Sequence, residues 1–192
     1  MIDSIFSDIP VQYENIAEAT KAIEFNMASD KQTGSLLKTL VASKPSGRIL
    51  ELGTGTGLAT SWIIDGMDGE TRLITIENSE LLLDIARNAL QDARVEFVLA
   101  DGYDWIQTYS GEKFDMVFAD AMPGKYDLFE ETIGLVKMGG FYIIDDMLPQ
   151  PNWPDAHPEK VERFLTELGK RNDIIFTKLN WSSGIIIVTK IK

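Results

Sequence analysis

The stretch "ILELGTGTGLATSWI", residues 49 to 63, joins an apolar run, a glycine-rich turn and the start of a helical pattern. Gly53, Gly55 and Gly57 allow the backbone to turn tightly and to approach a ligand closely, because glycine has no side chain to clash. Their spacing is G-x-G-x-G, whereas dinucleotide-binding turns have G-x-G-x-x-G. The stretch predicts a nucleotide-binding strand–turn–helix unit, although the spacing alone also fits a purely structural turn.

Downstream, short apolar runs alternate with helical patterns. The runs are rich in Val, Ile, Leu and Phe, as strands covered on both faces tend to be. Strands are predicted over residues 48–52, 72–77, 94–100, 114–120 and 140–145. Helices are predicted over residues 58–67, 79–91, 102–109 and 126–136. This alternation predicts a doubly wound, Rossmann-like α/β sheet with helices on both faces.

The C-terminal part breaks the alternation. A helix predicted over residues 158–171 precedes two strand-like runs, 173–181 and 184–190, with only a few residues between them. Because so short a link cannot make a parallel crossover, these two strands should pair antiparallel. We therefore expect a seven-stranded sheet that is mostly parallel, with one reversed C-terminal strand.

The region before the first strand carries two helical patterns, over residues 10–26 and 32–44. A chain of 192 residues is of the size of one domain with a substantial core. We expect a single domain, 1–192, in which residues 1–46 form a helical cover and residues 47–192 form the α/β core.

The composition narrows the class of protein. The formal net charge is −12, from 18 basic and 30 acidic residues, and this argues against nucleic acid as a partner because such binding depends on neutralising phosphates. The absence of cysteine excludes disulfides and thiolate metal sites. No apolar run approaches the roughly 18 residues of a membrane span, and the acidic start does not resemble a signal peptide. We expect a cytoplasmic protein.

Two further acidic residues stand where predicted strands end. Glu77 closes the second strand, where an acid in such a sheet accepts hydrogen bonds from ribose hydroxyls. Asp101 follows the third strand, and Gly102 lets the backbone come close to a bound base. Glu77 could instead be a solvated carboxylate at a helix entry, and Asp101 could be only a helix N-cap. Together with the glycines, both residues point to the carboxyl edge of the sheet.

These motifs resemble the class I S-adenosylmethionine-dependent methyltransferases, over roughly residues 48–192 and including the final hairpin. The resemblance implies that the glycines back the methionine part of the cofactor, Glu77 holds its ribose, and Asp101 with Gly102 frames its adenine. Glu51 would steady the loop or the amino-acid end. The predicted cofactor contacts are Glu51, Gly53, Thr54, Gly55, Gly57, Glu77, Asn78, Asp101, Gly102 and Asp120. Met27 and Ser29 lie where members of the family touch the cofactor.

Within that class, "FDMVFADAMPGKY" (114–126) and "GGFYIIDDM" (139–147) resemble the metal-dependent O-methyltransferases of the catechol and caffeoyl-CoA type. In that family an Asp after the fourth strand and an Asp-Asn pair after the fifth bind a divalent cation. By resemblance, Asp120, Asp145 and Asp146 are the metal ligands. Oxygen ligands alone suit Mg²⁺, Ca²⁺ or Mn²⁺. The alternative is that these acids end their strands in solvent.

The sequence departs from this family in two places. Asp146 stands where the family has Asn, so that three carboxylates would surround one ion. Pro123 stands where the family has a lysine that helps to deprotonate the acceptor. Lys125 could replace that lysine only if the turn folds back over the site, and it is otherwise a solvated lysine. His157, the only histidine, is the rival base, or else an exposed loop residue.

The sequence therefore predicts an S-adenosylmethionine-dependent, divalent-metal-assisted O-methyltransferase acting on a small, hydroxylated and aromatic acceptor. Its predicted catalytic residues are Asp120, Lys125 and His157. Three alternatives stay open: a metal-independent methyltransferase for another acceptor, including an RNA nucleoside; an NAD-dependent oxidoreductase; and a non-catalytic binding protein that retains the fold. A homodimer is compatible with the sequence, which does not determine the oligomeric state.

Overall fold

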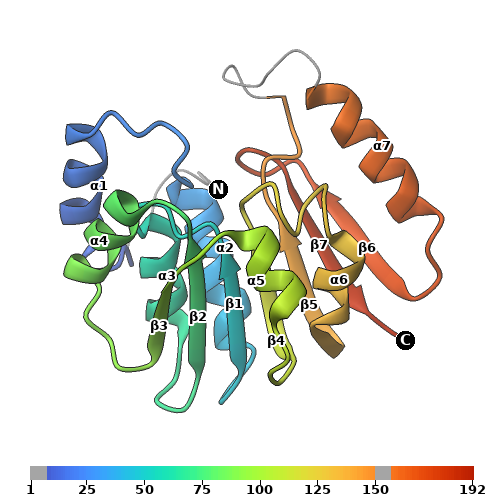
Figure 1. The fold of residues 1–192 in the computed structure, drawn as a ribbon, viewed down its shortest axis with the longest axis horizontal. Coiled ribbons are helices and arrows are strands. Elements are labelled where there is room, and N and C mark those ends of the chain that lie inside the picture. The colour runs from blue at the N-terminus through green and yellow to red at the C-terminus, as the bar shows by residue number, and fades with distance from the viewer. Residues whose placement is uncertain (1–7, 150–156) are drawn as a thin grey trace.

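The computed structural model describes residues 8–149 and 157–192. Its centre is a seven-stranded sheet in the order β3-β2-β1-β4-β5-β7-β6 (Figure 1). The strands are β1 (Arg48–Leu52), β2 (Arg72–Glu77), β3 (Val95–Leu99), β4 (Phe114–Ala119), β5 (Val136–Ile144), β6 (Ile174–Leu179) and β7 (Ile185–Lys190). The first five strands pair in parallel. The predicted fold class is confirmed, because β7 is the one reversed strand and pairs antiparallel with both β5 and β6.

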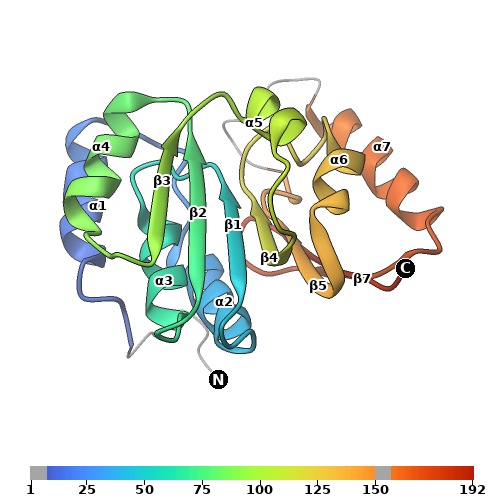
Figure 2. The same cartoon turned by 60° about the horizontal axis from the view of Figure 1, so that its bottom comes forward.

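Two layers of helices cover the sheet (Figure 2). On one face α2 (Lys31–Ala42) and α3 (Leu58–Gly66) bury Leu37, Val41 and Ile63 against the strands. On the other face lie α5 (Gly102–Thr108), α6 (Phe129–Gly134) and α7 (His157–Gly169), which bury an aromatic and aliphatic cluster that includes Phe164 and Leu168. Within the part of the chain that the structure describes, no helix is long and apolar enough to cross a membrane.

The N-terminal helix belongs to a third, smaller cluster. Helix α1 (Tyr13–Ala22) packs its Tyr13 and Ile16 against Trp62 of α3, next to α4 (Glu80–Ala89). The rings of Tyr13 and Trp62 meet edge to face, with their centroids 5.9 Å apart. The predicted helical region before the sheet is therefore present. It shares core residues with the α/β unit.

The region between β4 and β5 differs from the prediction. The expected helix over 126–136 is shortened to Phe129–Gly134, because Gly124 N–H donates to the carbonyl of Asp127 and closes a turn. Leu128, the residue before the helix, has a left-handed φ of 56°. Strand β5 begins at Val136 instead of residue 140, and its register against β4 shifts between Phe114 and Met116.

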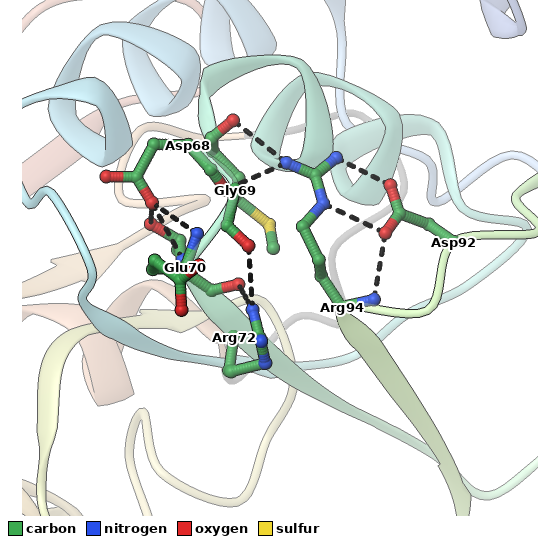
Figure 3. A network of polar contacts seen from close by, with 8 residues as sticks. Asp68, Gly69, Glu70, Arg72, Asp92 and Arg94 are labelled. Carbon is green, nitrogen blue, oxygen red and sulfur yellow. Dashed lines mark hydrogen bonds and ion pairs between the residues drawn. The ribbon is translucent and has the colours of Figure 1, made fainter.

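The amino edge of the sheet is closed by an arginine network (Figure 3). The Arg94 guanidinium is bidentate to Asp92 and donates to the carbonyls of Met67 and Asp68. The Asp68 carboxylate in turn accepts from Ser46 and Thr71, and the hydrogen bonds from Thr71 do most to lower the pKa of Asp68 to about 2. These bonds tie together the turns that lead into β2 and β3. The opposite, carboxyl edge is where the predicted site residues lie.

Candidate active site

Strand register brings the predicted site residues to one level. Leu52, the last residue of β1, is paired with Ile76 of β2 and Ala119 of β4, and Ala119 is paired with Ile144 of β5. The next residues along these strands are Gly53, Glu77, Asp120 and Asp145. Residues widely spaced in the sequence therefore meet at the carboxyl edge of the parallel strands, where such sheets bind ligands.

The glycine-rich turn depends on the conformational freedom of glycine. Gly53, Gly55 and Gly57 have φ values of 98°, 53° and 94°, which other residues rarely adopt. A Cβ atom on Gly53 would lie 2.6 Å from the carbonyl oxygen of Asp120, and one on Gly57 would lie 2.9 Å from Ala86 Cβ. The turn thus packs closely between the end of β4 and helix α4, as the sequence pattern indicates.

Glu77 fixes this turn from the neighbouring strand. One oxygen of its carboxylate accepts a hydrogen bond of 2.9 Å from the backbone N–H of Gly55. The other oxygen accepts from the backbone N–H groups of Asn78 and Ser79, at 3.0 and 2.9 Å. A carboxylate has about four lone-pair sites, so Glu77 retains capacity to accept from ribose hydroxyls.

Glu51 lies beneath the turn and does not line the cleft. It is fully buried, and one carboxylate oxygen accepts from the hydroxyls of Thr60 and Thr75, each at 2.6 Å. Thr75 also bonds to Thr54 of the glycine turn, at 2.6 Å between the two hydroxyl oxygens. Burial raises the pKa of Glu51 to about 7. This position supports a role in steadying the loop and not one in touching the amino-acid end of the cofactor.

A cleft of about 760 Å³ runs along the carboxyl edge. It joins the glycine turn at one end to a cluster of charged residues at the other. Its lining includes the predicted residues Gly53, Thr54, Gly55, Glu77, Asn78, Asp120, Lys125, Asp145, Asp146 and His157, together with Met27 and Ser29 from the segment before α2. One cleft therefore contains most of the predicted cofactor and catalytic residues.

Asp101 and Gly102 stand apart from that lining. The Asp101 carboxylate accepts from the backbone N–H groups of Tyr103 and Asp104, at 2.8 and 3.3 Å, and so caps the N-terminus of α5. A Cβ atom on Gly102 would lie 2.7 Å from the ring of Pro123. The helix-cap alternative is the one that this geometry supports, and a contact of Asp101 with adenine stays a prediction.

The three aspartates form an acidic cluster at the ends of β4 and β5. Asp120 accepts a 2.9 Å hydrogen bond from the hydroxyl of Ser29. Asp145 accepts from the Ser183 hydroxyl and from the backbone N–H of Asp146, the latter at 2.7 Å. Burial, and then the charge of Asp145, raises the pKa of Asp120 well above its usual range; burial, and then Asp146, raises the pKa of Asp145 to about 6.

Lys125 lies inside this acidic cluster. Its ammonium nitrogen is 3.8 Å from a carboxylate oxygen of Asp120 and 3.8 Å from one of Asp146. The residue is only 4% exposed. The turn after β4 does fold back, because Gly124 adopts a φ of 83° and packs against Leu52, where a Cβ atom would lie 2.5 Å from Leu52 Cδ1. A lysine is thus supplied to the site even though Pro123 occupies the family's lysine position.

The three aspartates do not converge on one point as metal ligands do. Across residues 8–149 and 157–192, no three His, Cys, Asp or Glu residues are grouped so that they could hold a metal ion. Asp146, with a left-handed φ of 58°, holds an oxygen toward Lys125. The arrangement of these residues therefore does not fit a divalent cation, and the predicted metal stays a prediction.

His157 borders the cleft at the start of α7. Its Nε2 atom lies 3.0 Å from the hydroxyl of Tyr126, and the two rings meet edge to face. Burial, and then the positive charge of Lys125, lowers the pKa of His157. This shift favours the neutral imidazole, which can accept a proton.

Three polar residues of the site were not predicted from the sequence. Tyr126 contacts His157, Ser183 donates to Asp145, and Asp30 accepts from the Ser182 hydroxyl. Asp30 could have been found as the N-cap of the predicted second helix, where it accepts from the backbone N–H groups of Gln32 and Thr33. The other two are placed by tertiary contacts alone.

The family model described as O-methyltransferase matches residues 6–191. The chain belongs to this family. A catechol O-methyltransferase of Mycobacterium tuberculosis is 29% identical over 150 residues, which are 76% of this chain and 68% of the relative. The alignments with further mycobacterial relatives span 52 to 53% of those proteins' own lengths. The chain thus spans about half the length of these further relatives.

Solved structures of this family have the same architecture. TomG, an O-methyltransferase from Streptomyces achromogenes involved in tomaymycin synthesis and solved in complex with S-adenosylmethionine, superposes with a TM-score of 0.81 at 25% identity, over 98% of this chain and 92% of that one. An O-methyltransferase from Bacillus cereus gives a TM-score of 0.83 at 24% identity, over 97% and 93%. The chain accordingly has the fold of these two O-methyltransferases.

Proposed function

We propose that the protein transfers a methyl group from S-adenosylmethionine to a hydroxyl group of a small aromatic acceptor. The observation that carries the proposal is that one cleft joins the glycine turn with Glu77 to the cluster of Asp120, Lys125 and His157. A donor held at one end and an acceptor at the other would meet within that cleft. Methyl transfer is an in-line displacement that needs chiefly alignment and a deprotonated acceptor.

The donor end is built from backbone and carboxylate groups. S-adenosylmethionine, when bound, supplies an electrophilic methyl group on a sulfonium. We assign Gly53, Thr54 and Gly55 to its methionine part, because glycine permits close approach of the backbone there. Glu77 and Asn78 are assigned to the ribose. Ser29 and Asp120, which are hydrogen-bonded to each other, border the same part of the cleft.

The acceptor end requires a proton acceptor and an apolar wall. His157, whose pKa is lowered by burial, is the assigned base for the acceptor hydroxyl. Tyr126 holds the imidazole through the 3.0 Å contact with Nε2. The aromatic ring of Tyr126 and the Met122 side chain border the same end of the cleft and suit a planar acceptor. Metal assistance stays a prediction, which the effect of excess EDTA on kcat/KM tests.

The proposal is tested by incubating the protein with radiolabelled S-adenosylmethionine and a panel of phenols and catechols. We expect label in the acceptor and S-adenosylhomocysteine as coproduct. Glu77→Ala removes a charged acceptor for ribose hydroxyls and should weaken S-adenosylhomocysteine binding by about 1.5–3 kcal/mol, or roughly 10- to 150-fold, in calorimetry.

The matched control is Glu80→Ala, an exposed carboxylate in the first turn of α4 three residues further on. Its affinity for S-adenosylhomocysteine should equal that of the wild type. Equal affinity in the wild type and Glu77→Ala would contradict the ribose assignment. Absence of methyl transfer to every hydroxylated acceptor, with transfer to another nucleophile, would contradict the acceptor class.

A further inference from the structure

We infer that Lys125 is the resident cation of this active site: its ammonium group binds the acceptor oxygen in the place of a divalent metal, and methyl transfer therefore needs no metal. The inference rests on the proposed function and concerns the same cleft. It assigns to Lys125 the role of a fixed positive charge instead of that of a base.

The first argument is the position of the charge. The ammonium nitrogen lies 3.8 Å from both Asp120 and Asp146, so it stands between the end of β4 and the end of β5. A lysine that is 4% exposed must have its charge compensated, because an isolated buried charge is very costly. The acids at the two strand ends provide that compensation, and the lysine in turn relieves their mutual repulsion.

The second argument is that the backbone holds Lys125 there. Lys125 follows Gly124, which is buried against Leu52 and Thr132 and whose N–H donates to the Asp127 carbonyl at 2.7 Å. Residues Pro123 and Asp127 also form a bridge across the turn. The turn is therefore fixed at both ends, and its backbone places the buried Lys125 beside the cluster.

The third argument concerns the ligands that a dication would need. Mg²⁺ and Ca²⁺ require several oxygens at about 2.0–2.6 Å. Here one carboxylate oxygen of Asp120 faces the Lys125 ammonium nitrogen at 3.8 Å, and the other accepts the hydrogen bond from Ser29. A dication between Asp120 and Asp146 would also lie beside the ammonium group of Lys125 and be repelled by it. The lysine and a dication thus compete for the same carboxylates.

The chemistry of the step is balanced without a metal. Lys125 donates an N–H to the acceptor oxygen and stabilises the negative charge that develops as the hydroxyl proton passes to His157. The oxygen lone pair forms a bond to the methyl carbon, and the electron pair of the breaking carbon–sulfur bond stays on sulfur. The products are the methyl ether and S-adenosylhomocysteine. Lys125 remains an ammonium group throughout.

The test combines activity with metal binding measured by thermal unfolding. In the wild type, excess EDTA should leave kcat/KM unchanged, and millimolar Mg²⁺, Ca²⁺ or Mn²⁺ should leave the Tm unchanged. Lys125→Met should lower kcat by about 100-fold or more, the effect of removing one preorganised donor at the developing charge, while the affinity for S-adenosylhomocysteine stays within twofold. Lys170→Met, an exposed lysine of the α7–β6 turn, is the control and should behave as the wild type.

A second variant gives a readout that a merely structural lysine would not produce. In Lys125→Ala the carboxylates lose their cation, so the same metals should now raise the Tm by several degrees. Loss of wild-type activity on chelation with recovery on adding a dication, or a metal-dependent Tm in the wild type, would overturn the inference. If the wild type fails to bind S-adenosylhomocysteine, it is the proposed function that fails, and the wild-type metal titration still decides the role of Lys125.

Discussion

Glu51 is a buried carboxyl group whose hydrogen bonds support the glycine turn. One of its oxygens receives two hydroxyl hydrogen bonds, and the other, Oε1, is buried with no hydrogen-bond partner among the described residues. Ionisation there is costly because the charge is removed from water without a counter-ion. The free energy of unfolding should therefore depend on pH through this residue.

The sign follows from proton linkage. Burial raises the pKa of Glu51 from 4.5 to about 7, so between these values the folded state holds a proton that the unfolded state has lost. The stabilisation is complete below about pH 4.5 and is lost as pH rises through 7, by roughly 3 kcal/mol in total. Urea unfolding from pH 4.5 to 8 should show this fall in the wild type. Glu51→Gln should lack this component, and identical pH profiles for the two proteins would contradict the pKa.

At the same scale, the sequence predicted the position of residues set by strand register better than the position of residues set by a turn. Gly53, Glu77 and Asp120 each directly follow or end a strand, so the pattern alone brings them together. The position of Lys125 depends on the left-handed Gly124 and on packing against Leu52, which no periodicity encodes. For Asp101 the sequence could not decide between two roles, because an acid at this position fits both a helix N-cap and a contact with a bound base.

At the scale of elements, the close approach of α2 to α3 is set by one glycine. A Cβ atom on Gly34 of α2 would lie 2.3 Å from Cδ1 of the fully buried Trp62 in α3. The segment that precedes α2 borders the cleft, and α3 begins at the glycine turn. The packing of these two helices therefore connects stability to the shape of the site.

Gly34→Ala sets two effects against each other. Alanine favours a helix over glycine by up to about 1 kcal/mol, whereas overpacking a rigid buried ring costs about 1–3 kcal/mol. Because the contact is with the five-membered ring of a buried indole and not with the end of a flexible chain, we expect net destabilisation in urea unfolding. Gly169→Ala, at the end of α7 with no atom within 4 Å of the added Cβ, is the control and should not be destabilised. A Gly34→Ala protein as stable as the wild type would contradict the close packing.

The elements themselves were predicted well where strands and helices alternate. All seven strands lie where the apolar runs indicate. The error fell on residues 126–136, where apolar residues at helical spacing belong in part to a turn and in part to β5. The prediction started the strand at Gly140, but β5 begins at Val136 and continues through Gly139, which has a left-handed φ of 75°.

At the scale of the whole molecule, segments near the two ends of the chain border the same cleft. Trp181, in the turn between β6 and β7, donates its indole N–H to the carbonyl of Gln32 at 3.0 Å, and Ser182 bonds to Asp30. Ser29 bonds to Asp120 at the end of β4. The segment before α2 is thereby joined to the central sheet and to the C-terminal hairpin, with the cleft between them.

Ligand binding should consequently stabilise both ends together. S-adenosylhomocysteine at 100 times its Kd contributes about 2.7 kcal/mol to the folded state, which for a chain of this size corresponds to a rise in Tm of roughly 5–10 °C. Hydrogen exchange should slow in residues 25–32 and in residues 180–184, because each segment holds the other in place across the cleft. Gly139 and Gly140, in the first half of β5 and away from the carboxyl edge, provide the internal control. Their amides should exchange equally with and without ligand. Protection confined to the glycine turn would show that the cofactor binds without engaging the cover, and the coupling between the two ends would then be absent.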